Sequence, residues 1–218
     1  MNETHDADLL MSFFEYRALF QRPIFSALSS SEPLAALFQA FKEWGVALSD
    51  VSSNPSPVNA AEYQTTIELL NRKYAFSAGL GSVRLSVTNP YWEEAKQIAQ
   101  IATAGLNAII SSTGAEVNQQ IVQLGMHLKP QNSSIKEVTS RFISPGVIPI
   151  VESDILACGF SLYSENCTWV IDRSALDRSA LFISLSRVFD SITSFESIAS
   201  ILGKEQQQAM EALRLKIV

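Results

Sequence analysis

The stretch that decides the fold is residues 63–128, YQTTIELLNRKYAFSAGLGSVRLSVTNPYWEEAKQIAQIATAGLNAIISSTGAEVNQQIVQLGMHL. Apolar and polar side chains alternate in residues 63–69, 74–78 and 83–87, and this period of two is typical of a strand with one buried face. The step Gly79-Leu80-Gly81 favours a tight turn, because glycine adopts backbone conformations that other residues avoid. The stretch therefore predicts three successive antiparallel strands.

A long helix is predicted after the third strand. Asn89 is a good N-cap, and Pro90 fits the first helical position because its missing N–H would have no partner there. Apolar residues then recur at helical spacing over 95–109, and Gly114 is suited to end the helix. Alternation returns in residues 122–128, which predicts a further strand. Hairpins covered on one face by a helix indicate an α+β domain, and no glycine-rich phosphate loop follows any of these strands.

The N-terminal residues 8–22 are rich in aromatic side chains and fit two structures. Their apolar positions match either a helix or a strand with a bulge, and we favour the strand because aromatic residues have high β-propensity. Exposed aromatic side chains in this segment would suit a homodimer contact. Residues 29–45 instead predict a helix, whose apolar stripe either packs in the core or forms a partner-binding groove.

The C-terminal half shows the same succession of elements. Three segments there alternate apolar and polar residues: 158–162, 167–171 and 181–185. Thr193 with Glu196 matches a capping box and predicts the start of a helix. Gly203 is expected to break this helix, so that a last amphipathic helix covers residues 204–216.

Strand–strand–strand–helix thus occurs twice, at about residues 62–113 and 154–212. We predict a single α+β domain over residues 1–218, built as a pseudo-repeat of two similar halves, about 1–132 and 133–218. The strands are expected to form one extended antiparallel sheet, with the helices packed mainly on one face. A sheet of about seven or eight strands lies within the usual range.

The composition limits the classes of function. The chain has 218 residues, of which 47% are hydrophobic and 17% are charged, so it can bury a large core and is not disordered. Its net charge of −6 argues against a general nucleic-acid-binding protein, which needs a basic face for phosphate contacts. No apolar run reaches the length of a membrane span, and residues 1–8 lack the pattern of a signal peptide. We therefore expect a cytoplasmic protein that binds neither nucleic acid nor membrane.

The segment Gly81–Trp92, GSVRLSVTNPYW, together with the long helix after it, resembles a sporadically distributed bacterial family of uncharacterised proteins. Members share a strand, a helix start of the Asn/Asp-Pro type, a long helix, a further strand and short terminal helices. The resemblance covers residues 63–218, whereas the N-terminal segment lacks the family's pattern. It implies an α+β fold and a bacterial source, and it brings no catalytic residue to this sequence.

Few residues are suited to catalysis or metal binding. His127 lies in the last strand of the organising stretch and is either a half-exposed surface histidine or a weak catalytic candidate. The sequence has no His/Cys spacing of a zinc site and no GxSxG segment, so we predict no metal and no cofactor. A turn at residues 164–166 would pair Cys167 several positions away from Cys158, and both are therefore expected to be free thiols.

Basic side chains occur at corresponding places in the two halves. These are Arg72, Lys73 and Arg84 in the first half, and Arg173, Arg178 and Arg187 in the second. One hypothesis is that each group binds an anion or an acidic partner. The alternative is that they are ordinary solvated charges on the face of a sheet.

No motif in the sequence identifies a reaction. We therefore predict a non-enzymatic binding or protein-interaction module, whose partner is an unknown protein or a small molecule. The alternative is a small-molecule-binding protein or a hydrolase with a pocket near His127. A deep pocket there, with a perturbed pKa, would favour the enzyme, and a flat exposed apolar patch would favour a protein partner.

Overall fold

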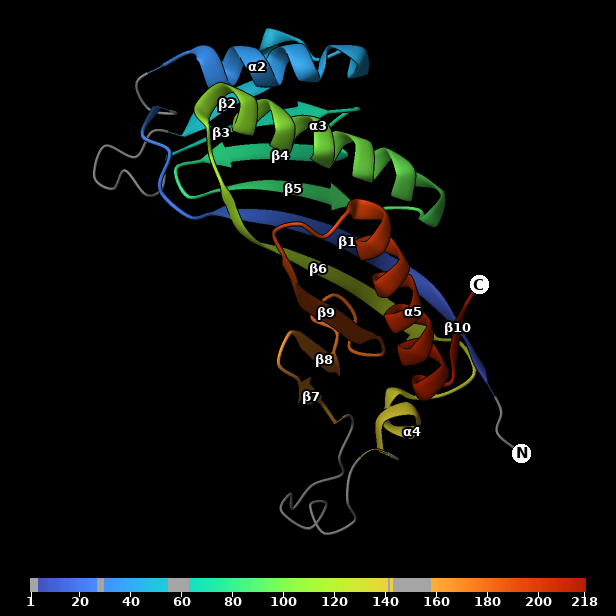
Figure 1. Ribbon diagram of the computed structural model, residues 1–218. Coiled ribbons are helices and arrows are strands. Elements are labelled where there is room, and N and C mark those ends of the chain that lie inside the picture. Colours follow the sequence, from blue (N-terminus) through green and yellow to red (C-terminus); the bar gives the residue numbers. More distant parts are fainter. Residues whose placement is uncertain (1–3, 27–29, 55–62, 141, 143–157) are drawn as a thin grey trace. The chain divides into compact units, whose positions relative to one another are not determined.

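The computed structural model describes residues 4–26, 30–54, 63–140, 142 and 158–218 (Figure 1). The strands are β1 (His5–Phe20), β2 (Val51–Asn54), β3 (Gln64–Leu69), β4 (Tyr74–Gly79), β5 (Ser82–Thr88), β6 (Val117–Pro130), β7 (Phe160–Tyr163), β8 (Cys167–Arg173), β9 (Leu181–Asp190) and β10 (Leu215–Ile217). The α-helices are α2 (Glu32–Ala40), α3 (Ala95–Thr113), α4 (Ile135–Ser140) and α5 (Phe195–Leu213), and the short 3-10 helices are η1 (Lys42–Trp44), η2 (Leu48–Asp50) and η4 (Trp92–Glu94).

The described strands belong to one sheet with the order β2-β3-β4-β5-β1-β6-β9-β8-β7, and β10 pairs with β1. The hairpin pairings β3–β4, β4–β5, β7–β8 and β8–β9 are antiparallel, as is β1 with β5. The short strand β10 joins β1 in parallel. The fold is therefore α+β with an extended antiparallel sheet, as the sequence predicts.

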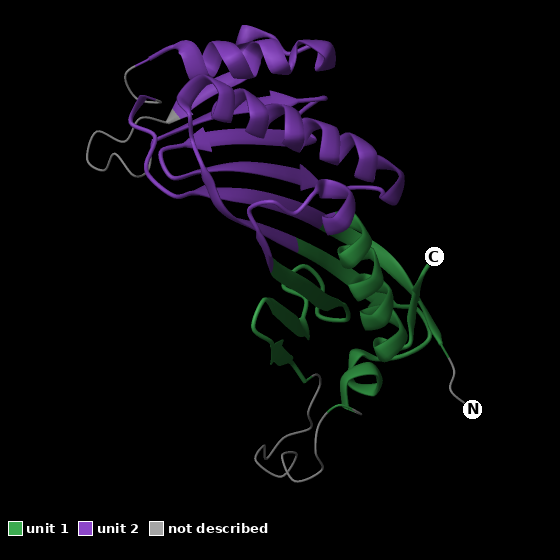
Figure 2. Ribbon diagram, in the orientation of Figure 1, with its two compact units in different colours: residues 1–12, 124–187, 199–218 green, residues 13–123, 188–198 purple. Residues whose placement is uncertain are grey.

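The chain divides into two compact units, coloured separately in Figure 2. Unit 1 comprises residues 1–12, 124–187 and 199–218, and unit 2 comprises residues 13–123 and 188–198. Strands β1, β6 and β9 and helix α5 each contribute residues to both units. The units therefore do not coincide with the predicted halves, about 1–132 and 133–218.

Alternation along the strands separates the core of unit 2 from its other sheet face. The register pairs Tyr16 with Leu85 and Ala18 with Val83, and all four side chains are buried. Residues between them point to the opposite side, because successive side chains of a strand alternate. We call that side, on strands β3, β4, β5 and β1, the open face of unit 2.

Strand β1 confirms the favoured prediction for the N-terminal segment. Its aromatic side chains Phe14, Tyr16 and Phe20 are at most 8% exposed. The expectation that the aromatic residues of this segment are exposed is therefore wrong for these three, and the homodimer contact stays a prediction.

Helix α3 packs on the core face of β4 and β5 through Gly105 (Figure 1). A Cβ atom at Gly105 would lie 2.4 Å from a ring carbon of Phe76 and 2.8 Å from one of Phe41. Both rings are buried, with centroids 5.2 Å apart in an edge-to-face arrangement. The missing side chain thus lets the helix approach the two rings directly.

The start of α3 differs from the predicted start at Pro90. Asn89 has a positive φ of 47°, and the Glu94 carboxylate accepts the backbone N–H of Tyr91 at 2.7 Å. This local bond closes a 3-10 turn, so the α-helix begins only at Ala95. The predicted end is confirmed, because Gly114 caps the helix with φ 68°.

Unit 1 has its own core, to which β6, β8, β9, β10, α4 and α5 all contribute. Its buried members are Ala7, Met126, Leu128, Ile135, Val138, Ile171, Leu181, Ile183, Leu213 and Leu215. Helix α4 begins with a capping box, in which Ser134 N–H donates to Glu137 Oε2 at 2.7 Å and Glu137 N–H donates to Ser134 Oγ at 3.2 Å.

Helix α5 continues through Gly203, where a break was predicted. Ile198 and Leu202 are buried on one side of it, and this apolar stripe outweighs the cost of about 1 kcal/mol for one glycine in a helix. The helix ends before Arg214, whose φ is 52°, and residues 215–217 form a strand rather than the predicted helical turn.

Replacing Gly105 with alanine tests the close packing of α3. Alanine normally favours a helix, but here its methyl group would overlap two buried rings. We expect Gly105→Ala to lower the free energy of unfolding by about 1–3 kcal/mol, measured by urea denaturation. Gly81→Ala is the control, since a Cβ atom there meets nothing within 4 Å. Equal stability of both variants would contradict this packing.

Candidate functional site

Four polar side chains form a row across the open face of unit 2. The registers place Thr66 opposite Ser77, Ser77 opposite Arg84, and Arg84 opposite Arg17. The row thus crosses strands β3, β4, β5 and β1 in order. Thr66, Ser77 and Arg84 lie on consecutive hairpin strands, whereas Arg17 is distant in sequence and is brought beside Arg84 by the pairing of β1 with β5.

Glu15 links the two arginines of the row. Arg17 Nη2 lies 3.2 Å from Glu15 Oε1, and Arg84 Nη2 donates to Glu15 Oε2. The arginine side chains are 42% and 43% exposed, so solvent screens these ion pairs, and each contributes at most about 1 kcal/mol. Two guanidinium groups share one carboxylate, which leaves a local excess of one positive charge.

A cavity of about 220 Å³ opens beside this row, and we call it the polar cavity. Its lining includes Arg17, Arg84, Ser77 and Gln64, together with the Gly79–Ser82 turn. Buried Nε of Arg84 has no hydrogen-bond partner among the described residues. The described lining residues therefore offer hydrogen-bond donors and positive charge, and no carboxylate is among them.

Such a donor set is suited to bind an anion. The guanidinium group is planar and presents N–H groups in a fixed fork that matches carboxylate and phosphate oxygens. Arg84 was among the sequence candidates, whereas Arg17 was missed. Alternation places Arg17 on the open face, but only the pairing of β1 with β5 shows that the two arginines are neighbours.

The other two candidates of the first half lie elsewhere. Arg72, in the β3–β4 turn, has an exposed side chain whose Nε is 2.8 Å from Glu68. Lys73 lies 2.6 Å from both carboxylate oxygens of Glu94 and 4.5 Å from the centre of the Tyr91 ring. Burial acts to raise the pKa of Glu94, but the hydrogen bonds from Lys73 and from Tyr91 N–H outweigh it and hold that pKa below its ordinary value.

The candidates of the second half do not come together. Arg187 is opposite Cys167 at one end of β8 and forms an ion pair with Glu205 of α5. Arg173 is opposite Leu181 at the other end of β8, and Arg178 is exposed in the loop between β8 and β9. Strand pairing therefore separates Arg187 from Arg173. Cys158 and Cys167 are free thiols, as predicted.

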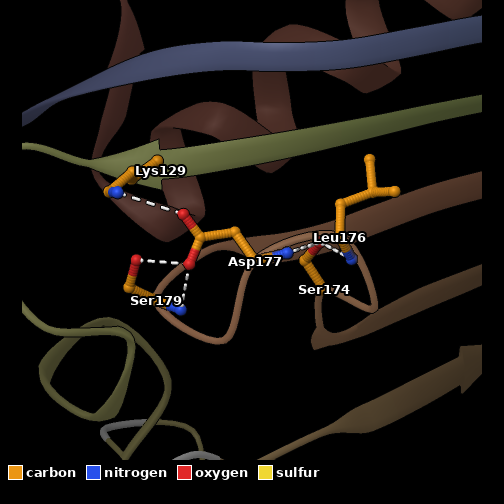
Figure 3. Close-up of polar contacts among 5 residues, drawn as sticks. All are labelled: Lys129, Ser174, Leu176, Asp177 and Ser179. Carbon is orange, nitrogen blue, oxygen red and sulfur yellow. Dashed lines mark hydrogen bonds and ion pairs between the residues drawn. The ribbon is translucent and has the colours of Figure 1, made fainter.

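His127 contacts the β8–β9 loop within unit 1. Its Nδ1 lies 2.8 Å from Ser174 Oγ, and its ring is 4.9 Å from that of Phe182. Ser174 Oγ also accepts the backbone N–H groups of Leu176 at 3.0 Å and Asp177 at 3.4 Å (Figure 3). With both acceptor positions engaged, the hydroxyl donates its own proton to His127, which favours a neutral ring protonated at Nε2.

The same loop is held to β6 by an ion pair. Asp177 accepts hydrogen bonds from the hydroxyl and backbone N–H of Ser179 at 2.7 and 2.8 Å, and Lys129 Nζ lies 3.0 Å away (Figure 3). These hydrogen bonds, of which the one from the Ser179 hydroxyl has the largest effect, lower the pKa of Asp177 to about 2. Ser174 is 3% exposed, so its hydroxyl stabilises the loop and is shielded from any substrate.

Comparisons with known proteins identify no family. The chain matches no family model, and no curated protein matches it significantly. One similar solved structure is the class II 3-hydroxy-3-methylglutaryl-CoA reductase from Streptococcus pneumoniae bound to NADPH in open conformations, at 10% identity and a TM-score of 0.27. The match covers 95% of this chain and 62% of the reductase chain, so this chain spans less than two thirds of that protein. So low a TM-score supports no inference.

Two further properties concern the described residues alone. In them no three His, Cys, Asp or Glu side chains gather as metal ligands. None of the helices in these ranges combines the length and the apolar character needed to cross a bilayer.

The environment of His127 predicts a pH dependence. Burial lowers its pKa below the ordinary value of about 6.5, so the unfolded chain binds a proton more readily than the folded protein does. Stability should therefore fall as the pH decreases below about 6.5, until the folded-state pKa is reached. We expect the imidazole signals of His127 in an NMR titration, assigned with His127→Gln, to give a pKa below 6.5. A value of 6.5 or higher would contradict the account that burial lowers the pKa of His127.

Proposed function

We propose that this protein is a non-enzymatic binding protein that recognises an anionic group at the polar cavity of unit 2. The observation that carries the proposal is the convergence of Arg17 and Arg84 on one carboxylate beside a cavity that is lined with donors. The arginine side chains are 42% and 43% exposed, so their N–H groups are accessible to a ligand oxygen.

The lining favours binding over chemistry. Among the described residues that line the polar cavity there is no histidine, aspartate, glutamate, lysine or cysteine. General acid–base catalysis most often uses a histidine, a carboxylate or a lysine within hydrogen-bond distance of the ligand, and of the residue types that serve this role the described lining offers Tyr63 alone. The hydroxyl of Ser77 is already bonded to that of Thr66 at 2.9 Å. The cavity therefore suits orientation of a carboxylate or phosphate group, carried by a small metabolite or an acidic segment of a protein.

Broader properties complete the proposal. We propose a cytoplasmic location, and the resemblance of residues 81–92 supports a bacterial source. We also infer that β3-β4-β5-α3 and β7-β8-β9-α5 form a pseudo-repeat, since the two series of elements follow the same order.

Removal of either arginine tests the proposal. A hydrogen bond to a charged group contributes about 1.5–3 kcal/mol, which corresponds to roughly a 10- to 100-fold change in affinity. We expect Arg84→Gln and Arg17→Gln each to weaken the binding of phosphate or citrate by at least tenfold, measured by isothermal titration calorimetry on the full chain.

Arg72→Gln is the matched control. It removes the same charge from an exposed arginine of unit 2 that has its own ion pair with Glu68. We expect this variant to bind as the wild type does. Equal losses in all three variants would show a general charge effect, and an absence of binding by the wild type to inorganic phosphate, pyrophosphate and citrate would also refute the anion site.

A hydrolase near His127 is the second candidate, because the distance from Nδ1 to Ser174 Oγ is 2.8 Å. Ser174 is buried, however, and its hydroxyl is engaged by two backbone N–H groups. We expect a fluorophosphonate probe not to label Ser174, as judged by mass spectrometry against the Ser174→Ala variant. Labelling of the wild type but not of the Ser174→Ala variant would establish that Ser174 is reactive and would support the hydrolase hypothesis.

A further inference from the structure

A second cavity, of about 220 Å³, lies on the core side of unit 2. Its walls come from α2, from the last turns of α3 and from β3 and β4. The apolar part of the lining includes Ile24, Leu34, Leu37, Ala78 and Ile109. We call it the apolar cavity, and it shares only Tyr63 and Gly79 with the polar cavity.

One wall of the apolar cavity carries a cluster of hydroxyl groups. Thr65 is 7% exposed, and its Oγ1 lies 3.3 Å from Ser53 Oγ and 3.4 Å from the Tyr63 hydroxyl. Both distances exceed the usual range of about 2.5–3.0 Å for O–H···O bonds. Thr65 is buried, whereas Ser53 is exposed and Tyr63 is half-buried. Buried polar groups normally have good partners, so the Thr65 hydroxyl can turn towards a better one.

We infer that the apolar cavity binds a small neutral molecule with one ring or short chain and a single hydroxyl group. Among the described residues the lining contains no charged side chain, which disfavours an ionic ligand. A cavity of about 150 Å³ in another protein holds benzene, so the larger volume here accommodates a ring and a polar substituent. The apolar walls bury the ring, and the Thr65 cluster hydrogen-bonds the hydroxyl.

Two fluorinated probes separate the roles of ring and hydroxyl. Binding of 4-fluorophenol and fluorobenzene to the full chain is followed by 19F NMR. We expect 4-fluorophenol to bind several-fold more tightly, because a neutral hydrogen bond adds roughly fivefold in affinity. Thr65→Val should abolish this preference while fluorobenzene still binds. Thr66→Val is the control, since it makes the same change on the adjacent residue of the open face.

Filling the cavity tests the location. Ala78→Val and Leu34→Trp each add volume at a lining residue and should reduce the binding of both probes at least tenfold. Ala75→Val, on the opposite face of β4, should leave the affinities for both probes unchanged. Arg17→Gln should also leave them unchanged, which would show that this site is separate from the anion site. If one of the two filling variants does not unfold cooperatively, it is not folded, and the other variant serves as the test. No binding to the folded wild type, or undiminished binding to a folded filling variant, would overturn the inference.

Discussion

The antiparallel register of β1 with β5 is the constraint on which unit 2 depends. It pairs Tyr16 with Leu85 inside and Arg17 with Arg84 outside, and a slip of one residue would exchange the two faces. The buried Tyr16 hydroxyl opposes such a slip, because it donates to Gln120 at 2.8 Å, and Gln120 Nε2 lies 2.9–3.2 Å from three backbone carbonyls. Burial raises the pKa of Tyr16, so the hydroxyl remains a neutral donor.

Unit 2 thereby offers two chemically different sites on opposite faces of the same strands. Thr65 and Thr66 illustrate the division, since adjacent side chains of β3 face the apolar cavity and the polar row respectively. The polar side concentrates positive charge around Glu15, and the described lining on the core side carries hydroxyls and no charged side chain. Gly105 supports the arrangement by bringing α3 close to β4, which holds the helix over the core face.

The spacing of apolar residues predicted much of the fold. Apolar side chains recur every second residue in a strand with one buried face and about every 3.6 residues in a helix with one buried face, so the spacing reports directly on burial. These patterns found the strands around Phe76, the long helix that ends at Gly114, and the strand character of β1. They failed where a short-range bond or distant packing decided the boundary, as at Asn89 and Gly203. For the site, the sequence identified Arg84 as a charged side chain near a hairpin. It could not provide Arg17, because the proximity of these residues is a property of strand pairing across a long separation in sequence.

The central claim is that the paired arginines bind an anion, and the N–H groups of the arginine side chains report on this directly. The measurement is a 15N–1H NMR titration of the arginine Nε–H signals with inorganic phosphate, assigned with Arg17→Gln, Arg84→Gln and Arg72→Gln. The account predicts saturable shifts of the Arg84 and Arg17 signals and of the Gly81 amide, with Arg72 unaffected. Shifts of equal size at all the arginines, or no saturable shift at Arg84, would contradict it.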